Sequence, residues 1–364
     1  MATREDLAAS SDGAAAPGVA PVSARAVAER GAVDRGTVGR PRSFYLPEGG
    51  TLRRDLHPRE LMEVARSGKG ILWVDIDATD RHQHALLELA FHFHPLAIED
   101  TLNPQSRVKL EEYADHLFAI VRGVQFCETT EDPYDVETSN LCFFLGKNLL
   151  VTTHSGQAAA VESVVERVER SPDLLARGAE RLMHAIMDSA VDSYFPILDQ
   201  LDTFVDGLEE RIFTSFDDTA LRDIFSVKRL VLSLRRHLAP QREVFNVLTN
   251  RPSPLLSREA QVYFRDVYDH MLRINDSIET YRELLGNTLD SYLSQVSNRL
   301  GTATKGLSLA ATLSVPFVMV SGMWGMNFAQ IPLSQHPHGF AIMMVIQLAL
   351  GIGLVAALRW MKIL

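Results

Sequence analysis

Acidic side chains recur through the middle of the chain at spacings of three and four residues. Because an α-helix has 3.6 residues per turn, this spacing places them on one face of a helix. Such a face attracts cations, and it is also typical of a helix surface turned to water. The residues leave both interpretations open. They are Asp188, Asp192, Asp199, Asp202, Asp206, Glu209 and Glu210.

Two histidine pairs, His82 with His84 and His92 with His94, could be taken for metal ligands. Zinc ligands on one helix are spaced i and i+4, whereas residues at i and i+2 point apart. No H-E-x-x-H or C-x-x-C motif accompanies the pairs. A metalloenzyme is therefore the weakest alternative, and we predict neither a catalytic residue nor a cofactor. No G-x-x-x-x-G-K-[ST] motif indicates ATP-driven chemistry.

A second periodic set begins with an acid, continues with small polar residues and ends with apolar ones. Its three- and four-residue steps predict one face of a long helix. Small residues suit the lining of an ion path, and they equally suit a helix–helix packing seam. The set comprises Asp290, Ser294, Ser297, Gly301, Thr304, Leu307, Ala311, Val315, Val318 and Gly322.

The end of the chain predicts two membrane spans. Residues 306–326 and 339–358 carry no charged side chain, and each segment matches the roughly 20 residues that cross a bilayer. Residues 328–338 between them contain no Lys or Arg, whereas basic residues flank the outer sides of the pair. This bias predicts an inner (plasma) membrane protein whose termini both face the cytosol. The flanking residues are Arg299, Lys305, Arg359 and Lys362.

A long helix precedes the first span. No proline occurs between Pro254 and Pro316, and apolar residues keep a helical period over this stretch. An unbroken helix of about 60 residues is about 90 Å long, more than a globular domain needs. Two spans per chain cannot enclose an aqueous pore, so any ion path must lie on the axis of an oligomer.

The region before these helices predicts a mixed α/β domain. Strand patterns cover Ile71–Asp77 and residues 117–126, 141–145 and 149–153, with helical patterns over Pro58–Ser67 and residues 81–91 and 157–170. Cys127 and Cys142 lie in apolar strand-like runs. We expect both to be buried thiols in a reducing compartment.

Charge is divided unevenly along the 364 residues. Residues 301–364 contain no Asp or Glu, and only Lys305, Arg359 and Lys362 are charged there. The first 300 residues therefore hold 33 basic and 46 acidic side chains, a net charge of −13. This acidity argues against a nucleic-acid partner, which needs a basic surface, and suits a cationic one.

The first span ends in Trp324-Gly325-Met326-Asn327. A Gly-Met-Asn sequence at this place resembles the signature of the CorA family of magnesium transporters. Residues 94–100, 107–111, 263–270 and 292–298 also resemble family segments, and Pro316 falls within the span as the family's proline does. The resemblance covers about residues 44–364.

This resemblance implies a funnel-shaped homopentamer with an α/β cytosolic domain, a long helical stalk and two C-terminal transmembrane helices. The expected divisions are a disordered tail (1–42), the α/β cytosolic domain (43–175), an acidic helical hairpin region (176–254), the stalk helix continuing into the first span (255–326), an external loop (327–338), the second span (339–359) and a cytosolic C-terminus (360–364).

The resemblance also implies roles for particular residues. Gly325, Met326 and Asn327 would form the pore mouth, where a neutral amide holds Mg²⁺ through its water shell. Leu307 would close a hydrophobic gate, and Val315 would form a second narrow ring. Asp100, Asp266 and Glu99 would bind regulatory Mg²⁺ between neighbouring subunits. Ordinary salt bridges to Arg107 or Arg265 are the alternative for these acids.

The sequence leaves two candidates for the transported ion, Mg²⁺ and Zn²⁺. Mg²⁺ follows from the family, with Co²⁺ and Ni²⁺ as further cations. The outer loop, however, has no acid and carries His336 and His338. It looks more like the ZntB branch, and imidazole is a better ligand for Zn²⁺ than for Mg²⁺. A membrane-anchored Mg²⁺ sensor or scaffold without transport is the alternative of another class.

Overall fold

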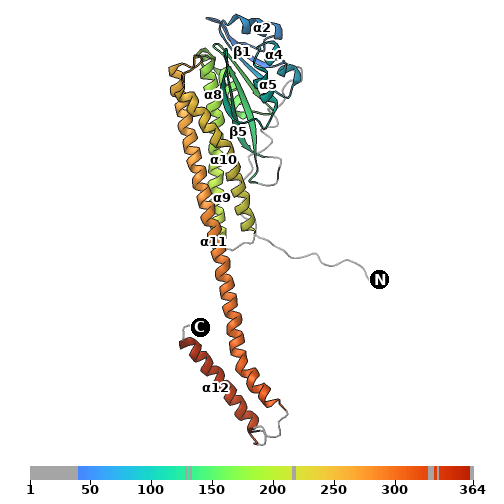
Figure 1. Ribbon diagram of the computed structural model, residues 1–364, viewed down its shortest axis with the longest axis vertical. Helices are drawn as coiled ribbons and strands as arrows, with labels where there is room; N and C mark the ends of the chain where they lie inside the picture. The colour runs from blue at the N-terminus through green and yellow to red at the C-terminus, as the bar shows by residue number, and fades with distance from the viewer. Residues whose placement is uncertain are drawn as a thin grey trace, which may run out of the picture.

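The computed structural model describes residues 40–127, 130, 133–214, 219–326, 332–333 and 336–360. Over these residues the chain is elongated (Figure 1). A sheet-containing domain lies at one end, one long helix runs down most of the molecule, and the last helix folds back along the far end of that helix.

A seven-stranded sheet forms the centre of the α/β domain, with strand order β2-β1-β3-β7-β6-β5-β4. Neighbouring strands are antiparallel except β3 and β7, which are parallel. The predicted strand Ile71–Asp77 is confirmed as β3. The strands are β1 Arg42–Leu46, β2 Arg53–Arg54, β3 Ile71–Asp77, β4 Lys109–Glu112, β5 Leu117–Phe126, β6 Val136–Leu145 and β7 Leu149–His154.

Short helices cover one face of the sheet. Leu72, Val74 and Ile76 of β3 point to this face and pack with Leu61 and Leu87 of the helices. The helix predicted over residues 81–91 is present as two one-turn pieces separated at Ala85. The elements on this side are α2 Pro58–Ser67, α3 Arg81–His84, α4 Leu86–Leu89 and α5 Pro95–Leu102.

Longer helices cover the other face, where Trp73 of β3 is fully buried in a cluster that continues along the helices. Both faces of the sheet are therefore dry, as its apolar runs require. Cys142 is buried as expected, whereas Cys127 is only half-buried. The helices are α6 Ala159–Arg170, α7 Asp173–Ala176, α8 Ala179–Asp192, α9 Tyr194–Thr214, α10 Ala220–Asn250 and the first part of α11 Arg258–Trp324.

The acidic face predicted for one helix is divided between two. Asp188 and Asp192 belong to α8, and the other members belong to α9. Pro196 explains the division, because proline has no N–H for an interior helix bond and is tolerated only in a first turn. The expectation of a single continuous stripe was wrong.

The longest helix, α11, has 67 residues and is about 100 Å long at 1.5 Å per residue. Its first part packs between the other long helices and buries Phe264, Val267 and Ile274. Its last part extends beyond them and, among the described helices, packs against α12, Gly339–Trp360 (Figure 1). The stalk and the first span are thus one helix.

Arg42, which the sequence pattern placed at the end of the N-terminal tail, is the first residue of β1. Its guanidinium donates to Asp75 at 2.7 Å and to Glu162 at 2.8 Å. Asp75 is 3% exposed, so a buried carboxylate holds this strand in place. Residues 1–39 of the expected tail lie outside the described residues.

Candidate ion pathway and metal site

The face of α11 predicted to line a pore is exposed in the single chain. Leu307, Val315 and Val318 expose 73%, 58% and 70% of their surface. A contiguous row of exposed apolar side chains marks a surface that meets another molecule or a membrane. The other residues of the face are also exposed: Asp290, Ser294, Ser297, Gly301, Thr304, Ala311 and Gly322.

Two further leucines belong to this face and were missed. Leu293 and Leu300 are 54% and 63% exposed and precede Leu307 by fourteen and seven residues. A seven-residue repeat returns to nearly the same side of a helix, and apolar residues at that interval are typical of helix–helix association. The heptad of leucines was the signal in the sequence that indicated these positions.

The opposite side of the same helix faces α12. The half-buried residues in this part of α11 are Leu309, Leu313, Pro316, Val320 and Trp324. At about 100° per residue their mean direction is about 180° from that of the row formed by residues 307, 311, 315, 318 and 322. Because α12 covers the back of the helix, the row on the opposite side remains exposed in the single chain.

The helix ends at Trp324, just before the expected mouth. The Gly325 N–H donates to the carbonyls of Ser321 at 3.0 Å and Gly322 at 3.2 Å. Gly325 has φ −85° and ψ 1°, which any residue adopts, so its backbone conformation does not require glycine. Met326 is 48% exposed. Asn327 lies outside the described residues.

The two histidines of the loop between the two apolar helices lie close together. The N–H of His338 donates to Nδ1 of His336 at 3.2 Å, and the two ring centroids are 6.1 Å apart. One imidazole nitrogen is therefore engaged by the backbone. Residues 327–331, 334 and 335 of the same loop lie outside the described residues.

Asp100 on α5 is held in an ion pair. Its carboxylate lies 2.7 Å from Lys109 Nζ and accepts a hydrogen bond from Ser106 Oγ at 2.9 Å. Burial lowers the pKa of Lys109, but hydrogen bonds and charge from Asp100 and Glu111 outweigh it and raise the pKa overall. The sequence had left a salt bridge as the alternative to a metal site at Asp100. Asp100 does form a salt bridge, and its partner is Lys109, not Arg107. Glu99, beside it, is exposed.

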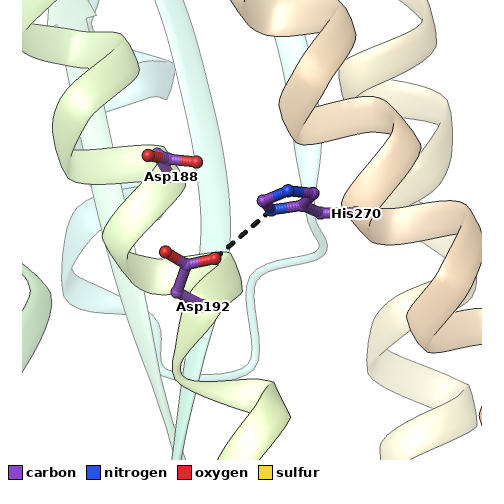
Figure 2. A group of neighbouring side chains, drawn as sticks. All are labelled: Asp188, Asp192 and His270. Carbon is purple, nitrogen blue, oxygen red and sulfur yellow. Dashed lines mark ion pairs between the residues drawn. The ribbon is translucent and has the colours of Figure 1, made fainter.

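Asp266 lies on α11, where it is exposed. The structure does not bring it together with Asp100 and Glu99 as a metal-binding group within one chain. Among the described residues, the group with metal-ligand geometry is Asp188, Asp192 and His270, whose ligand atoms all lie within 4.8 Å of one another. Figure 2 shows both aspartates on α8 facing the imidazole on α11.

The contacts of this group suit a cation. His270 Nδ1 lies 3.3 Å from Asp192 Oδ1, and Asp188 Oδ1 is buried without a hydrogen-bond partner in the described structure. Burial raises the pKa of Asp188, and the charges of Asp192 and Asp266 raise it further. Asp266 is thus close enough to contribute to the same negative potential. A bound cation would relieve this repulsion.

The spacing that identifies this group was present in the sequence. Asp188 and Asp192 are four residues apart on α8, and Asp266 and His270 are four apart on α11. Residues at i and i+4 share a helix face, so two such pairs can converge where two helices pack. The acidic residues were noted on sequence alone, but His270 was not, because the pairing of α8 with α11 is a tertiary contact.

The H-x-H histidines are used in other ways. His84 Nε2 lies 3.0 Å from Thr101 Oγ1, and His94 Nδ1 accepts the backbone N–H of Leu96 at the start of α5. None of the four belongs to the group with metal-ligand geometry among the described residues. Their positions give the metalloenzyme interpretation no support.

By length and composition, two helices are suited to crossing a membrane, the apolar end of α11 and α12. None of the most apolar 18-residue window of α11 is buried within the chain, and 17% of that of α12 is buried. Core helices of a soluble protein would be mostly buried. The exposure of both segments therefore fits a lipid environment.

Comparison with known proteins agrees with this architecture. The family model described as "CorA-like Mg2+ transporter protein" matches residues 68–361. The putative metal ion transporter YfjQ of Bacillus subtilis is 30% identical over 282 residues, 78% of this chain and 86% of that protein. The cobalt/magnesium transport protein CorA of Thermotoga maritima is 30% identical over 257 residues, 70% of this chain and 72% of that protein.

Solved structures share the fold. The complete structure of the CorA magnesium transporter from Methanocaldococcus jannaschii matches with a TM-score of 0.76 at 22% identity, covering 88% of this chain and 97% of that one. The ZntB cytoplasmic domain from Vibrio parahaemolyticus matches with a TM-score of 0.55 at 16% identity, over 71% of this chain and 99% of that one. With the family model spanning most of the sequence, this chain belongs to the CorA family of metal ion transporters.

Proposed function

We propose that this chain conducts divalent cations, Mg²⁺ first, through a pore on the axis of a homopentamer in the plasma (inner) membrane. The observation that carries the proposal is the exposed row on α11, which faces away from α12. Five such rows around one axis would give a path that is polar at the cytosolic end and apolar within the membrane. Both termini would lie in the cytosol.

The proposed mouth is built from Gly325, Met326 and Asn327. Mg²⁺ gives up its water reluctantly, so a ring of neutral amides binds the hydrated ion without holding it too tightly. Gly325 needs no special backbone angle, and a Cβ there would be 3.4 Å from the Ser321 carbonyl. In the proposed pore, the absence of a side chain at Gly325 would leave space beside the axis.

The proposed gate is a ring of Leu307, with Val315 and Val318 forming narrow apolar rings nearer the mouth. A constriction lined by apolar side chains excludes water and so blocks ions, which need hydration. The row before it, Gly301 and Thr304, is small and polar. Asp290 would give the cytosolic end a negative potential that favours cations.

Regulation is proposed to act through Asp100, Glu99 and Asp266 at the junction of neighbouring cytosolic domains. The group of Asp188, Asp192 and His270 supports this proposal, because His270 lies one helical turn from Asp266 on α11 and faces the two aspartates of α8. Bound cation would stabilise the closed pentamer, and its loss would shift the population toward the open state. Asp100 must share or release Lys109 to bind a metal.

The second candidate cation is Zn²⁺, as expected for a ZntB-like branch. It is favoured by the closeness of His336 and His338 at the outer loop and by the imidazole in the inner metal group. Nitrogen ligands prefer Zn²⁺ and other transition metals to Mg²⁺. A membrane-anchored Mg²⁺ sensor without transport would use only the inner group.

Uptake by liposomes containing the purified protein tests these alternatives. Mg²⁺, Zn²⁺, Co²⁺ and Ni²⁺ are compared in wild type, in Asn327→Ala and in Asn298→Ala. Asn298 is the control, since it is an exposed amide on the same helix that is not among the residues assigned to the pore mouth or gate.

We expect Mg²⁺ uptake that is lost in Asn327→Ala and kept in Asn298→Ala. Uptake of Zn²⁺ without Mg²⁺ would support the ZntB-like alternative. An assembled oligomer that passes none of the four ions would overturn transport and leave the sensor.

A further inference from the structure

Gln347 is the one residue with a hydrogen-bonding side chain between residues 339 and 358 of α12. It is 6% exposed, although its neighbour Leu348 is 62% exposed. An amide in the interior of a membrane is costly unless its polar groups are hydrogen-bonded. We therefore expect the buried Gln347 amide to form hydrogen bonds with α11.

The amide nitrogen of Gln347 bonds to α11 twice. Nε2 lies 2.9 Å from Ser321 Oγ and 3.3 Å from the Phe317 carbonyl oxygen. A Gln amide has two N–H groups, so one can serve each acceptor. The two acceptors are four residues apart and lie on one side of α11, which fixes both the height and the rotation of this turn relative to α12.

One more hydrogen bond leads from this contact to the proposed mouth. The carbonyl of Ser321, whose hydroxyl contacts Gln347, accepts the N–H of Gly325 at 3.0 Å. Gly325 is the first residue after α11. Two consecutive contacts therefore connect the middle of α12 with the residue that begins the Gly-Met-Asn sequence.

Packing next to the amide reinforces this arrangement. A Cβ at Gly351, one turn after Gln347, would lie 2.9 Å from Cζ of Phe317, so the aromatic ring rests on this glycine. The Phe317 carbonyl thus accepts a hydrogen bond from Gln347, and the Phe317 ring packs on Gly351. A sliding motion of α11 against α12 would disrupt both contacts.

We propose that Gln347 is a positioning residue for ion transport, holding the outer turn of α11 against α12 so that Gly325 and the mouth keep their place relative to the pore axis. This inference rests on the proposed function. Gln347 does not contact the ion in this assignment. It acts through Ser321 and the carbonyl of Phe317.

The test compares Gln347→Met, which keeps the side-chain length and removes both hydrogen bonds, with Leu348→Met on the exposed side of the same helix. Mg²⁺ uptake by liposomes is measured as a function of ion concentration. We expect the apparent KM to rise severalfold in Gln347→Met, with an unchanged amount of assembled oligomer by size exclusion. Leu348→Met should match wild type.

Ser321→Ala separates positioning from general packing. It should raise KM in the same direction, and combining it with Gln347→Met should be no worse than Gln347→Met alone, because both remove the same link. Independent and additive effects would overturn the proposal. So would a loss of uptake that only follows a loss of assembled oligomer.

Amide hydrogen exchange in lipid provides a readout that does not depend on transport. Gln347→Met should speed exchange in residues 321–326 and leave the sheet of the α/β domain unchanged, whereas Leu348→Met should alter neither. Unchanged exchange in residues 321–326 would overturn the inference even if wild type conducts ions. Absence of uptake in wild type would instead count against the proposed function.

Discussion

The two ends of α11 differ in what covers them. In the first part, Phe264, Met271 and Leu285 are each fully buried against the other long helices. In the last part, Leu300, Leu307 and Val318 expose 63%, 73% and 70% of their surface. The same helix thus carries apolar residues with entirely different surroundings. Within the described residues, the first part packs against several long helices, whereas the last part packs against α12 on one side.

This difference shows where the molecule depends on something outside a single chain. The α/β domain and α6–α10 bury both faces of the sheet and the inner sides of the helices, so their stability comes from their own core. The apolar end of α11 packs against α12, and the rest of the surface of these two segments is exposed and apolar. In the proposed oligomer, lipid and further copies of the chain cover that surface, and its function should be sensitive to changes that leave the folded core intact.

The comparison predicts the largest difference between two leucines on α11. Leu285→Ala should lower the free energy of unfolding by about 2–5 kcal/mol, because it leaves a cavity in a fully buried position. Leu300→Ala, at 63% exposed, should change it by less than about 0.5 kcal/mol and instead weaken oligomer assembly. Chemical unfolding and size exclusion measure the two effects. Equal destabilisation by both would break the comparison.

Cation binding at Asp188, Asp192 and His270 should stabilise the α/β domain and the long helices packed on it. At a hundred times its Kd, a bound ion adds about 2.7 kcal/mol to the free energy of unfolding. The raised pKa of Asp188 means that protons compete for this carboxylate, so the effect should shrink as pH falls through that pKa.

Thermal unfolding with Mg²⁺ or Co²⁺ checks this second prediction. Asp188→Asn should abolish the stabilisation, and Asp199→Asn, an exposed acid on α9, should keep it. A shift that survives in Asp188→Asn would place the ion elsewhere.

Shortening the side chain at the proposed gate should change ion transport and leave the stability of the fold unchanged. Leu307→Ala should increase ion leak severalfold under conditions that close wild type, because a wider ring admits water more readily. Leu348→Ala, on the exposed side of α12, is the control and should show wild-type leak. Flux from loaded liposomes measures both, and a large loss of thermal stability in Leu307→Ala would contradict the contrast between the two ends.

The buried pair of Asp75 and His154 should make the stability of the α/β domain pH-dependent. Burial alone would raise the pKa of Asp75 and lower that of His154, but the hydrogen bond and charge between them reverse both shifts. Stability from His154 is therefore fully present below its ordinary pKa of 6.5 and is lost as pH rises through its folded value. Stability from Asp75 is present above 3.8 and is lost as pH falls through its lowered value.

The melting temperature of wild type should consequently fall more than that of His154→Gln between about pH 6 and about pH 9. Calorimetry of the two proteins over this range provides the measurement. Parallel curves would show that the pair does not titrate as described.

The smallest effect is expected at the seam between α11 and α12. Gly351→Ala places a Cβ 2.9 Å from Phe317 Cζ and should cost about 1 kcal/mol, since the ring can move aside in part. Gly353→Ala meets nothing within 4 Å and is the matched control. Heat-induced dissociation of the oligomer in detergent should separate the two variants, and identical behaviour would mean that this seam is not packed as the structure shows.

Local and periodic features could be predicted from the sequence. The apolar segments, the exposed row from Asp290 to Gly322 and the strand Ile71–Asp77 all follow from patterns of period 3.6 or 2 and from length. The family resemblance followed from short contiguous segments. Each of these depends on residues close together in the chain, so one sequence is enough.

Contacts between distant segments could be decided only by the tertiary structure. The sequence did not indicate that His270 faces Asp188 and Asp192, that Lys109 pairs with Asp100, or that Gln347 bonds to Ser321. These pairs are separated by many residues, and their closeness results from how α8, α11, α12 and the sheet pack. Periodicity determines which face of a helix is apolar, whereas packing determines what that face meets.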